Sequence, residues 1–471
     1  MPAFRLILMI AAALLATLAP ARADTKPNII YILADDLGYG ELGCYGQEKI
    51  KTPCLDQIAA EGMRFTQHYS GAAVCAPSRF TLMTGKHIGR SFTTGQRQAL
   101  EPQTLTIQNV ARQAGYKTAS IGKWGLGEDP MQQGNDKWYG FLSQGYAHYF
   151  YPERIWMNDQ QVEIPANAQK NGLRVDGRYT EKIKDGVYIH DEFTREAMSF
   201  ISENQDTPFL LYLPYTIPHL ELVVPEDSLA EYRGKFPEDR PFDTIAMDRQ
   251  PAGGNRFYDG YGYCSADTPR ATYAAMITRM DRDIGRIMAL LIELNLDENT
   301  IVMFSSDNGP SQWDAGGTDR DFFNSNGELR SGKGTYYEGG LRVPMLARWP
   351  GKIQPGSVTD HISYFPDVLP TIAELVGVEV SESVDGLSLV PTLLGTGQQQ
   401  EHEFLYWAAS MRMGKWKYVH GGKEYDGPKG GGQLFNLEDD PGETEDLAMQ
   451  YPEIVSKFIA IHEQSRNPIS P

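Results

Sequence analysis

The chain has 471 residues, of which 43 are Lys or Arg and 61 are Asp or Glu, so its formal charge is −18. Hydrophobic residues at 41% and charged residues at 22% are typical of a globular protein and exclude a disordered or collagen-like chain. The acidic balance argues against a nucleic-acid-binding protein, which needs a basic surface. Four Cys are too few for a disulfide-dense scaffold.

Residues 1–23 have the composition of a secretory signal peptide. Arg5 precedes an apolar stretch over residues 6–18, and residues 21–23 (Ala-Arg-Ala) form a typical cleavage site. We expect a mature chain from Asp24 that is periplasmic or secreted; an uncleaved anchor is the alternative. Because the removed segment carries two Arg and no acidic residue, the mature charge becomes −20. No later run reaches the ~18 apolar residues of a membrane span, so we expect no membrane association after cleavage.

Short apolar runs alternate with longer helical patterns, which favours an α/β fold with a large, mostly parallel sheet and crossover helices. Helices are expected over residues 53–64 and 271–296. We expect a catalytic domain over residues 24–395 and a small C-terminal α+β subdomain over 396–471. The expected subdomain elements are strands at 404–408 and 416–419, in a small antiparallel sheet, and a closing helix at 452–464.

Four of the apolar runs end in polar residues that could take part in catalysis. In chain order these residues are Asp35 and Asp36, Lys123, His219 (reached through a Pro-rich loop), and Asp307 with Asn308. Ligands of α/β sheets bind beyond the carboxyl ends of the strands. We therefore expect these side chains to meet at one edge, although each alone could be an ordinary loop residue.

The two acidic strand ends, 35–36 and 307–308, together predict a metal site. Adjacent buried carboxylates repel each other, and a cation relieves the repulsion. Three carboxylates and one amide oxygen form a hard ligand set that suits Ca²⁺ or Mg²⁺ and not zinc. A single Asp-Asp pair could instead be a turn or a helix cap; the repetition of the pattern favours the metal.

Residues 75–79 (Cys-Ala-Pro-Ser-Arg) are the most specific segment of the chain. Pro77 is tolerated in the first turn of a helix, which places Cys75 at a helix N-terminus, where backbone N–H groups favour an anion. On physical grounds alone, Cys75 would more often be a plain buried thiol.

Together with other segments, this motif resembles the signature of the formylglycine-dependent sulfatases of the alkaline phosphatase superfamily. The resemblance covers nearly the whole mature chain and implies an alkaline-phosphatase-like sheet and hydrolysis of sulfate esters. It implies that a maturation enzyme converts Cys75 to formylglycine, whose hydrate attacks sulfur and then expels sulfate. The other segments that carry it are residues 27–36, 82–86, 122–124, 306–309, 332–334, 338–344 and 412–417.

The resemblance also implies roles for individual residues. Arg79 orients the formylglycine, Lys123 and Lys333 hold sulfate oxygens, and His219 protonates the leaving alkoxide. Outside this context His219 would be a packed loop histidine and the lysines solvated surface charges. Ca²⁺, with Mg²⁺ as the alternative, is expected to polarise the sulfate. Its implied ligands are Asp35, Asp36, the converted Cys75, Asp307 and Asn308.

One position departs from the family pattern. Many relatives carry a His in Gly-Lys-Trp-His-Leu-Gly, whereas residue 125 is Gly in this chain. The role of that His in deprotonating the geminal diol is thus unassigned. His148, in an aromatic-rich segment, is a candidate substitute or substrate contact; a structural histidine between aromatics is the alternative.

The net negative charge of the chain would repel a long polyanion unless a basic groove were present, and the sequence has no run of Lys and Arg that would line such a groove. We therefore expect a pocket for a sulfate at the end of a glycan chain, or on a mono- or oligosaccharide, with His148, Trp313 and Arg320 as substrate contacts. The alternative for an aromatic residue such as Trp313 is packing in the hydrophobic core. The competing interpretations are a phosphodiesterase or phosphonate monoester hydrolase of the same superfamily, and a sulfated-glycan-binding protein that never converts its Cys. Cys44 and Cys54 could form a disulfide or remain free.

Overall fold

The computed structural model describes residues 26–91, 100–102, 104–127, 129–244, 262–312, 316–380, 384–421 and 431–465. The predicted signal peptide and Trp313 lie outside these residues. Within them, no helix is both long enough and apolar enough to span a bilayer. All four cysteines are free, so Cys44 and Cys54 are not joined to each other.

A mixed sheet forms the centre of the molecule. Among the described residues it has ten strands, in the order β13-β2-β12-β11-β1-β10-β4-β5-β6-β7. The five central strands are mutually parallel, and the sheet turns antiparallel at β12 on one side and at β6 on the other. The central strands are β11 (Thr300–Ser306), β1 (Asn28–Asp35), β10 (Phe209–Pro218), β4 (Lys117–Lys123) and β5 (Lys137–Phe141). The outer strands are β13 (Ser357–Thr359), β2 (Met63–Phe65), β12 (Met345–Arg348), β6 (Arg154–Met157) and β7 (Gln160–Glu163).

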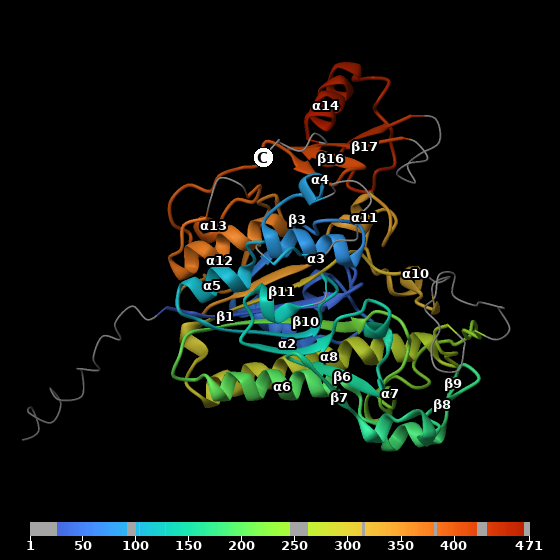
Figure 1. The fold of residues 1–471 in the computed structure, drawn as a ribbon. Coiled ribbons are helices and arrows are strands. Elements are labelled where there is room, and N and C mark those ends of the chain that lie inside the picture. The colour runs from blue at the N-terminus through green and yellow to red at the C-terminus, as the bar shows by residue number, and fades with distance from the viewer. Residues whose placement is uncertain are drawn as a thin grey trace, which may run out of the picture.

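Helices cover both faces of this sheet (Figure 1). Ile30 and Ile32 of β1 face one core, whereas Tyr31 and Leu33 face the other. Because neither face meets water, β1 and β10 are almost continuously apolar instead of alternating with polar residues. The first core is closed by α2 (Pro53–Glu61), α6 (Ile189–Glu203) and α8 (Pro269–Glu293), and the second by α3 (Cys75–Thr84), α5 (Ile107–Gln113) and α12 (Val368–Val376). The α/β prediction with a mostly parallel sheet is confirmed.

A second, antiparallel sheet of four strands follows in the C-terminal part. Trp407 anchors this unit, because its indole packs against Tyr69 and Tyr364 and its Nε1 donates to the carbonyl oxygen of Ser70 at 2.8 Å. Figure 1 shows the unit above the helices of the second core. Its elements are β15 (Leu405–Tyr406), β16 (Ser410–Met413), β17 (Trp416–Val419), β18 (Gln433–Asn436) and α14 (Pro452–Ser465). A small C-terminal antiparallel sheet is therefore present as predicted.

Two local predictions were wrong. The helix expected to reach Arg64 ends at Glu61, because Met63–Phe65 pairs with β12 and β13 as strand β2. The Pro-rich loop expected before His219 is instead the end of β10, which continues to Pro218. Its backbone stays beside β1, where Asp35 lies opposite Pro218.

Candidate active site

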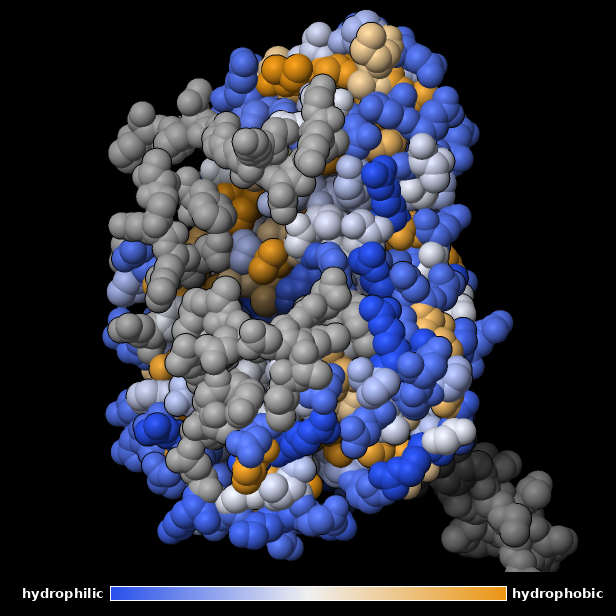
Figure 2. All heavy atoms as spheres, turned by 90° about the vertical axis from the view of Figure 1, so that its right-hand side faces the viewer, coloured by the Kyte–Doolittle hydropathy of each residue, from blue (hydrophilic) through white to orange (hydrophobic). Residues whose placement is uncertain are grey.

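The carboxyl ends of four parallel strands and the N-terminus of α3 meet at one edge of the sheet. Asp35 and Lys123 are the last residues of β1 and β4, and His219 and Asp307 directly follow β10 and β11. Cys75 is the first residue of α3, as predicted, with Val74 as the N-cap. Figure 2 shows a hollow on the face toward which these strands run. The chain topology thus brings the predicted residues together from segments far apart in sequence.

Arg79 occupies the base of this arrangement. It lies one helical turn after Cys75 on α3 and is fully buried. Its Nε and Nη2 donate to Asp307 Oδ2 at 3.0 and 2.8 Å, and its Nη1 donates to the carbonyl oxygen of Lys123 at 3.0 Å. Arg79 therefore ties the first turn of α3 to the ends of both β11 and β4.

The two lysines each contact one carboxylate of the Asp35-Asp36 pair. Lys123 Nζ donates to Asp35 Oδ2 at 2.7 Å, and Lys333 Nζ lies 2.7 and 2.8 Å from the two oxygens of Asp36. The amide of Asn308 donates to Asp36 Oδ1 at 2.8 Å. With Arg79 and Asp307, the cluster holds three cationic side chains against three carboxylates, so its formal charge is zero.

The same residues fit a hard divalent cation. Ligand atoms of Asp35, Cys75 and Asp307 lie within 4.8 Å of one another, as do those of Asp35, Asp36 and His219. Asp35 Oδ1 and Asn308 Oδ1 are buried and have no hydrogen-bond partner in the structure. Buried oxygen atoms without a partner are costly, and Ca²⁺ or Mg²⁺ would satisfy them.

Burial and charge act in opposite directions on the acidic groups. Burial alone would raise the pKa of Asp35, but Lys123, His219 and Arg79 hold this pKa well below its usual range. For Asp307, burial and the neighbouring Asp35 raise the pKa to about 7, against the effect of Arg79. Burial also raises the pKa of the Cys75 thiol. The positive side chains therefore compensate the negative charge of Asp35 well and that of Asp307 poorly.

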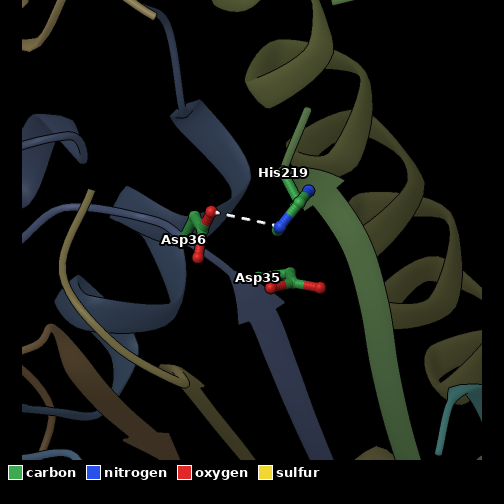
Figure 3. A group of neighbouring side chains, drawn as sticks. All are labelled: Asp35, Asp36 and His219. Carbon is green, nitrogen blue, oxygen red and sulfur yellow. Dashed lines mark ion pairs between the residues drawn. The ribbon is translucent and has the colours of Figure 1, made fainter. Parts of the chain in front are cut away.

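His219 completes the cluster on the side of β10. Figure 3 shows its ring beside Asp35 and Asp36, with Nε2 3.5 Å from Asp36 Oδ2. Its Nδ1 lies 2.6 Å from the carbonyl oxygen of Leu220. A carbonyl can only accept, so Nδ1 carries the proton in the neutral ring and Nε2 is left as an acceptor. Burial and Lys333 lower the pKa of His219 to about 4.

The predicted substrate contacts differ in position. The ring of His148 stacks on that of His219, with centroids 3.8 Å apart. Arg320 lies against the turn that carries Lys333, since its Nη1 is 2.7 Å from where a Cβ on Gly332 would lie. Trp313 is outside the described residues. Tyr263, whose hydroxyl oxygen is 3.0 Å from His148 Nδ1, could not be predicted from the sequence, because no motif surrounds it.

This sheet, with its carboxylates and cations at the strand ends, places the protein in the alkaline phosphatase superfamily. The chain belongs to the sulfatase family: the family model described as Sulfatase matches residues 27–378. A second model, described as N-sulphoglucosamine sulphohydrolase, C-terminal, matches residues 331–465. Hydrolysis of sulfate esters, predicted from the motifs, is thus confirmed as the class of reaction.

Several known proteins are similar along most of their length. Steryl-sulfatase of Mus musculus is 30% identical, covering 82% of this chain and 68% of its own. Arylsulfatase A of Homo sapiens is 32% identical, covering 86% and 76%. The N-acetylgalactosamine-6-O-sulfatase of Bacteroides thetaiotaomicron is 28% identical and covers 92% of each. The solved structure of Ps i-CgsB in complex with k-i-k-neocarrahexaose is 26% identical, with a TM-score of 0.71 over 95% of this chain and 94% of that one.

Proposed function

We propose that this sulfatase is exported and removes sulfate from the end of a glycan chain, or from a mono- or oligosaccharide, with Cys75 converted to formylglycine. The observation that carries the proposal is the position of Cys75 at the start of α3, within 4.8 Å of carboxylate oxygens of Asp35 and Asp307. A maturation enzyme that recognises the segment around Cys75 is a required partner. The predicted signal peptide supports a periplasmic or secreted location.

The proposed catalytic groups are Cys75, Arg79, Lys123, His219 and Lys333. The hydrated aldehyde would supply one hydroxyl to attack sulfur and a second to release the sulfate. Arg79 fixes the helical turn on which this group is carried. His219 presents Nε2 toward the cluster, where it can take up the proton that the attacking hydroxyl releases and deliver it to the leaving oxygen.

The proposed metal ligands are Asp35, Asp36, Asp307, Asn308 and the converted Cys75. A bound Ca²⁺ or Mg²⁺ would polarise the sulfate and the nucleophile. With a divalent cation, the neutral cluster would carry a charge of about +2, which attracts a singly charged sulfate ester. The carboxylates would then no longer need Lys123 and Lys333, and both ammonium groups could turn to the sulfate oxygens.

Two observations support a carbohydrate as the alcohol part. A relative that covers most of this chain is named for a sulfated sugar, and Ps i-CgsB was solved in complex with an oligosaccharide. The chain charge of −18 disfavours a long polyanion along the surface and supports action on a terminal sulfate. Arg320 and Trp313 remain proposed contacts of such a sugar.

Steady-state kinetics on paired esters tests the proposal. We expect hydrolysis of 4-nitrophenyl sulfate and of at least one of the 6-sulfates of N-acetylgalactosamine, N-acetylglucosamine and galactose. We expect slower hydrolysis of 4-nitrophenyl phosphate and of a phenyl phosphonate monoester. Preference for the phosphorus esters would instead support the phosphonate monoester hydrolase interpretation, and no turnover of any ester would support the glycan-binding one.

A matched pair of lysine variants on strand β4 tests the site itself. Lys123 at the end of the strand is fully buried, whereas Lys117 at its start is exposed. Lys123→Ala should lower kcat/KM by about 100- to 1,000-fold, as expected for loss of a group that stabilises developing charge. Lys117→Ala should retain wild-type kinetics. Equal effects of the two substitutions would contradict the assignment.

A further inference from the structure

Two histidines from distant segments are stacked within the active site. His148 ends the short helical turn η3 (Tyr146–His148), and His219 follows β10. Their ring centroids are 3.8 Å apart and their planes differ by 17°. The side chain of His148 is buried, and its Nε2 has no hydrogen-bond partner. A buried ring nitrogen without a partner is costly unless a ligand satisfies it.

Contacts around Gly125 hold the η3 segment against the end of β4. Gln144 Nε2 donates to the carbonyl oxygen of Gly125 at 3.1 Å. The backbone φ of Gly125 is +73°, and a Cβ there would lie 2.0 Å from Gln144 Nε2. A side chain at residue 125 would therefore displace Gln144. The segment that carries His148 is thus anchored two residues from Lys123.

Hydrogen bonds at the Nδ1 atoms give the two rings opposite roles. Leu220 accepts from His219 Nδ1, so Nε2 of His219 is an acceptor. Tyr263 contacts His148 Nδ1 through a phenol, which is the better donor of the two groups, so Nδ1 accepts and Nε2 of His148 carries the proton. The stacked pair therefore offers one N–H donor and one acceptor.

The titratable groups that face His148 are compatible with a neutral ring. They come from three other parts of the site: His219 after β10, Lys123 and Asp35 at strand ends, and Lys333 in the turn after residue 331. Burial, His219 and Lys123 lower the pKa of His148 well below its usual range. At neutral pH, His148 is therefore a hydrogen-bond donor at Nε2 and not a charge.

We propose that His148 is a substrate-contacting, specificity-determining residue whose Nε2–H donates a hydrogen bond to a hydroxyl or ring oxygen of the alcohol part of the sulfate ester. The lysines near the sulfate site carry positive charge and serve the sulfate oxygens. A neutral donor beside His219 instead suits the uncharged oxygens next to the leaving group. This inference rests on the proposed function and specifies the alcohol as one that carries further oxygen atoms, as a sugar does.

The test measures kcat/KM of His148→Phe and of wild type on two esters. This substitution keeps an aromatic ring for stacking but removes Nε2. The probes are 4-nitrophenyl sulfate, whose alcohol part has no hydroxyl group, and the saccharide 6-sulfate that wild type hydrolyses fastest among the three named above. We expect kcat/KM for the saccharide sulfate to fall about 10- to 100-fold, the effect of losing one hydrogen bond to a desolvated polar group. For 4-nitrophenyl sulfate we expect a change of less than about threefold.

Two further variants separate substrate contact from a structural role. His148→Gln, whose amide N–H can reach the position of Nε2–H, should recover part of the saccharide activity. His68→Phe is the matched control: His68 is also buried with an unpartnered Nε2, but it packs between Phe65 and Phe365 away from the site. It should leave both activities unchanged.

The outcomes distinguish this inference from the proposed function. If His148→Phe loses both activities equally, or neither, while wild type hydrolyses the saccharide sulfate, only the role of His148 is overturned. If wild type hydrolyses 4-nitrophenyl sulfate but no saccharide sulfate, the carbohydrate class and the His148 contact are both overturned.

Discussion

Replacing Arg79 with Met should destabilise the protein by about 3–5 kcal/mol, because removing one partner of a buried ion pair leaves the other charge without compensation. The Arg79 guanidinium donates twice to Asp307 Oδ2 and also lies 3.4 Å from Asp35 Oδ2. Methionine fills a similar volume without charge, so Asp35 and Asp307 would repel each other with Lys123 as the remaining nearby buried cation. The lost bond to the Lys123 carbonyl adds about 1 kcal/mol.

Urea unfolding followed by tryptophan fluorescence measures this cost, in EDTA and again with Ca²⁺. Since a cation between Asp35 and Asp307 replaces part of the missing charge, Ca²⁺ should stabilise R79M more than wild type. Arg112→Met is the surface control, because Arg112 is 56% exposed and lies 4.0 Å from its partner Asp136; it should cost less than about 1 kcal/mol. A cost for R79M no larger than for this control would refute the reasoning.

Three further perturbations test other parts of the structure. Burial raises the pKa of Glu41 from 4.5 to about 7, so between these pH values the native state binds more protons than the unfolded state. The free energy of unfolding should therefore fall by about 3 kcal/mol as pH rises through this window. Urea titrations at several pH values should show a flatter pH dependence for Glu41→Gln than for wild type. Lys417 is fully buried between Glu338 and Glu443, so Lys417→Met should cost about 3–5 kcal/mol and lower the melting temperature, whereas an unchanged melting temperature would show that the C-terminal sheet is not held by this contact. EDTA should lower kcat more than about tenfold with recovery on Ca²⁺, and full activity in EDTA would exclude a required cation.

Four of the five central strands, β1, β4, β10 and β11, could be predicted because their burial on both faces leaves short apolar runs in the sequence, whereas β5 was not predicted. The short outer strands β2 and β13 have three residues each, too few to show a period. The end of α2 was misplaced because it depends on a tertiary contact: a Cβ at Gly62 would lie 2.2 Å from the carbonyl oxygen of Ala347. The extension of β10 through Pro218 depends equally on its pairing with β1.

The polar groups at the site could be predicted because each stands at the end of an apolar run or inside a specific motif. Which of these groups contact each other could not be predicted, since nothing in the sequence shows that Lys123 contacts Asp35 or that Lys333 contacts Asp36. Tyr263 approaches the site from a segment without motif or period. Its contact with His148 depends on how the chain folds between strands.

Mass spectrometry of residue 75 in fully active protein from its native cells tests the central claim most directly. Cleavage after Arg64 and Arg79 releases the peptide Phe65–Arg79, which contains Cys75 as its sole cysteine. We predict an aldehyde at this position, recognised by replacement of the thiol sulfur with oxygen together with loss of two hydrogen atoms and by reaction with a hydrazide, and loss of activity in Cys75→Ala. An intact thiol in a preparation with full sulfatase activity would contradict the account.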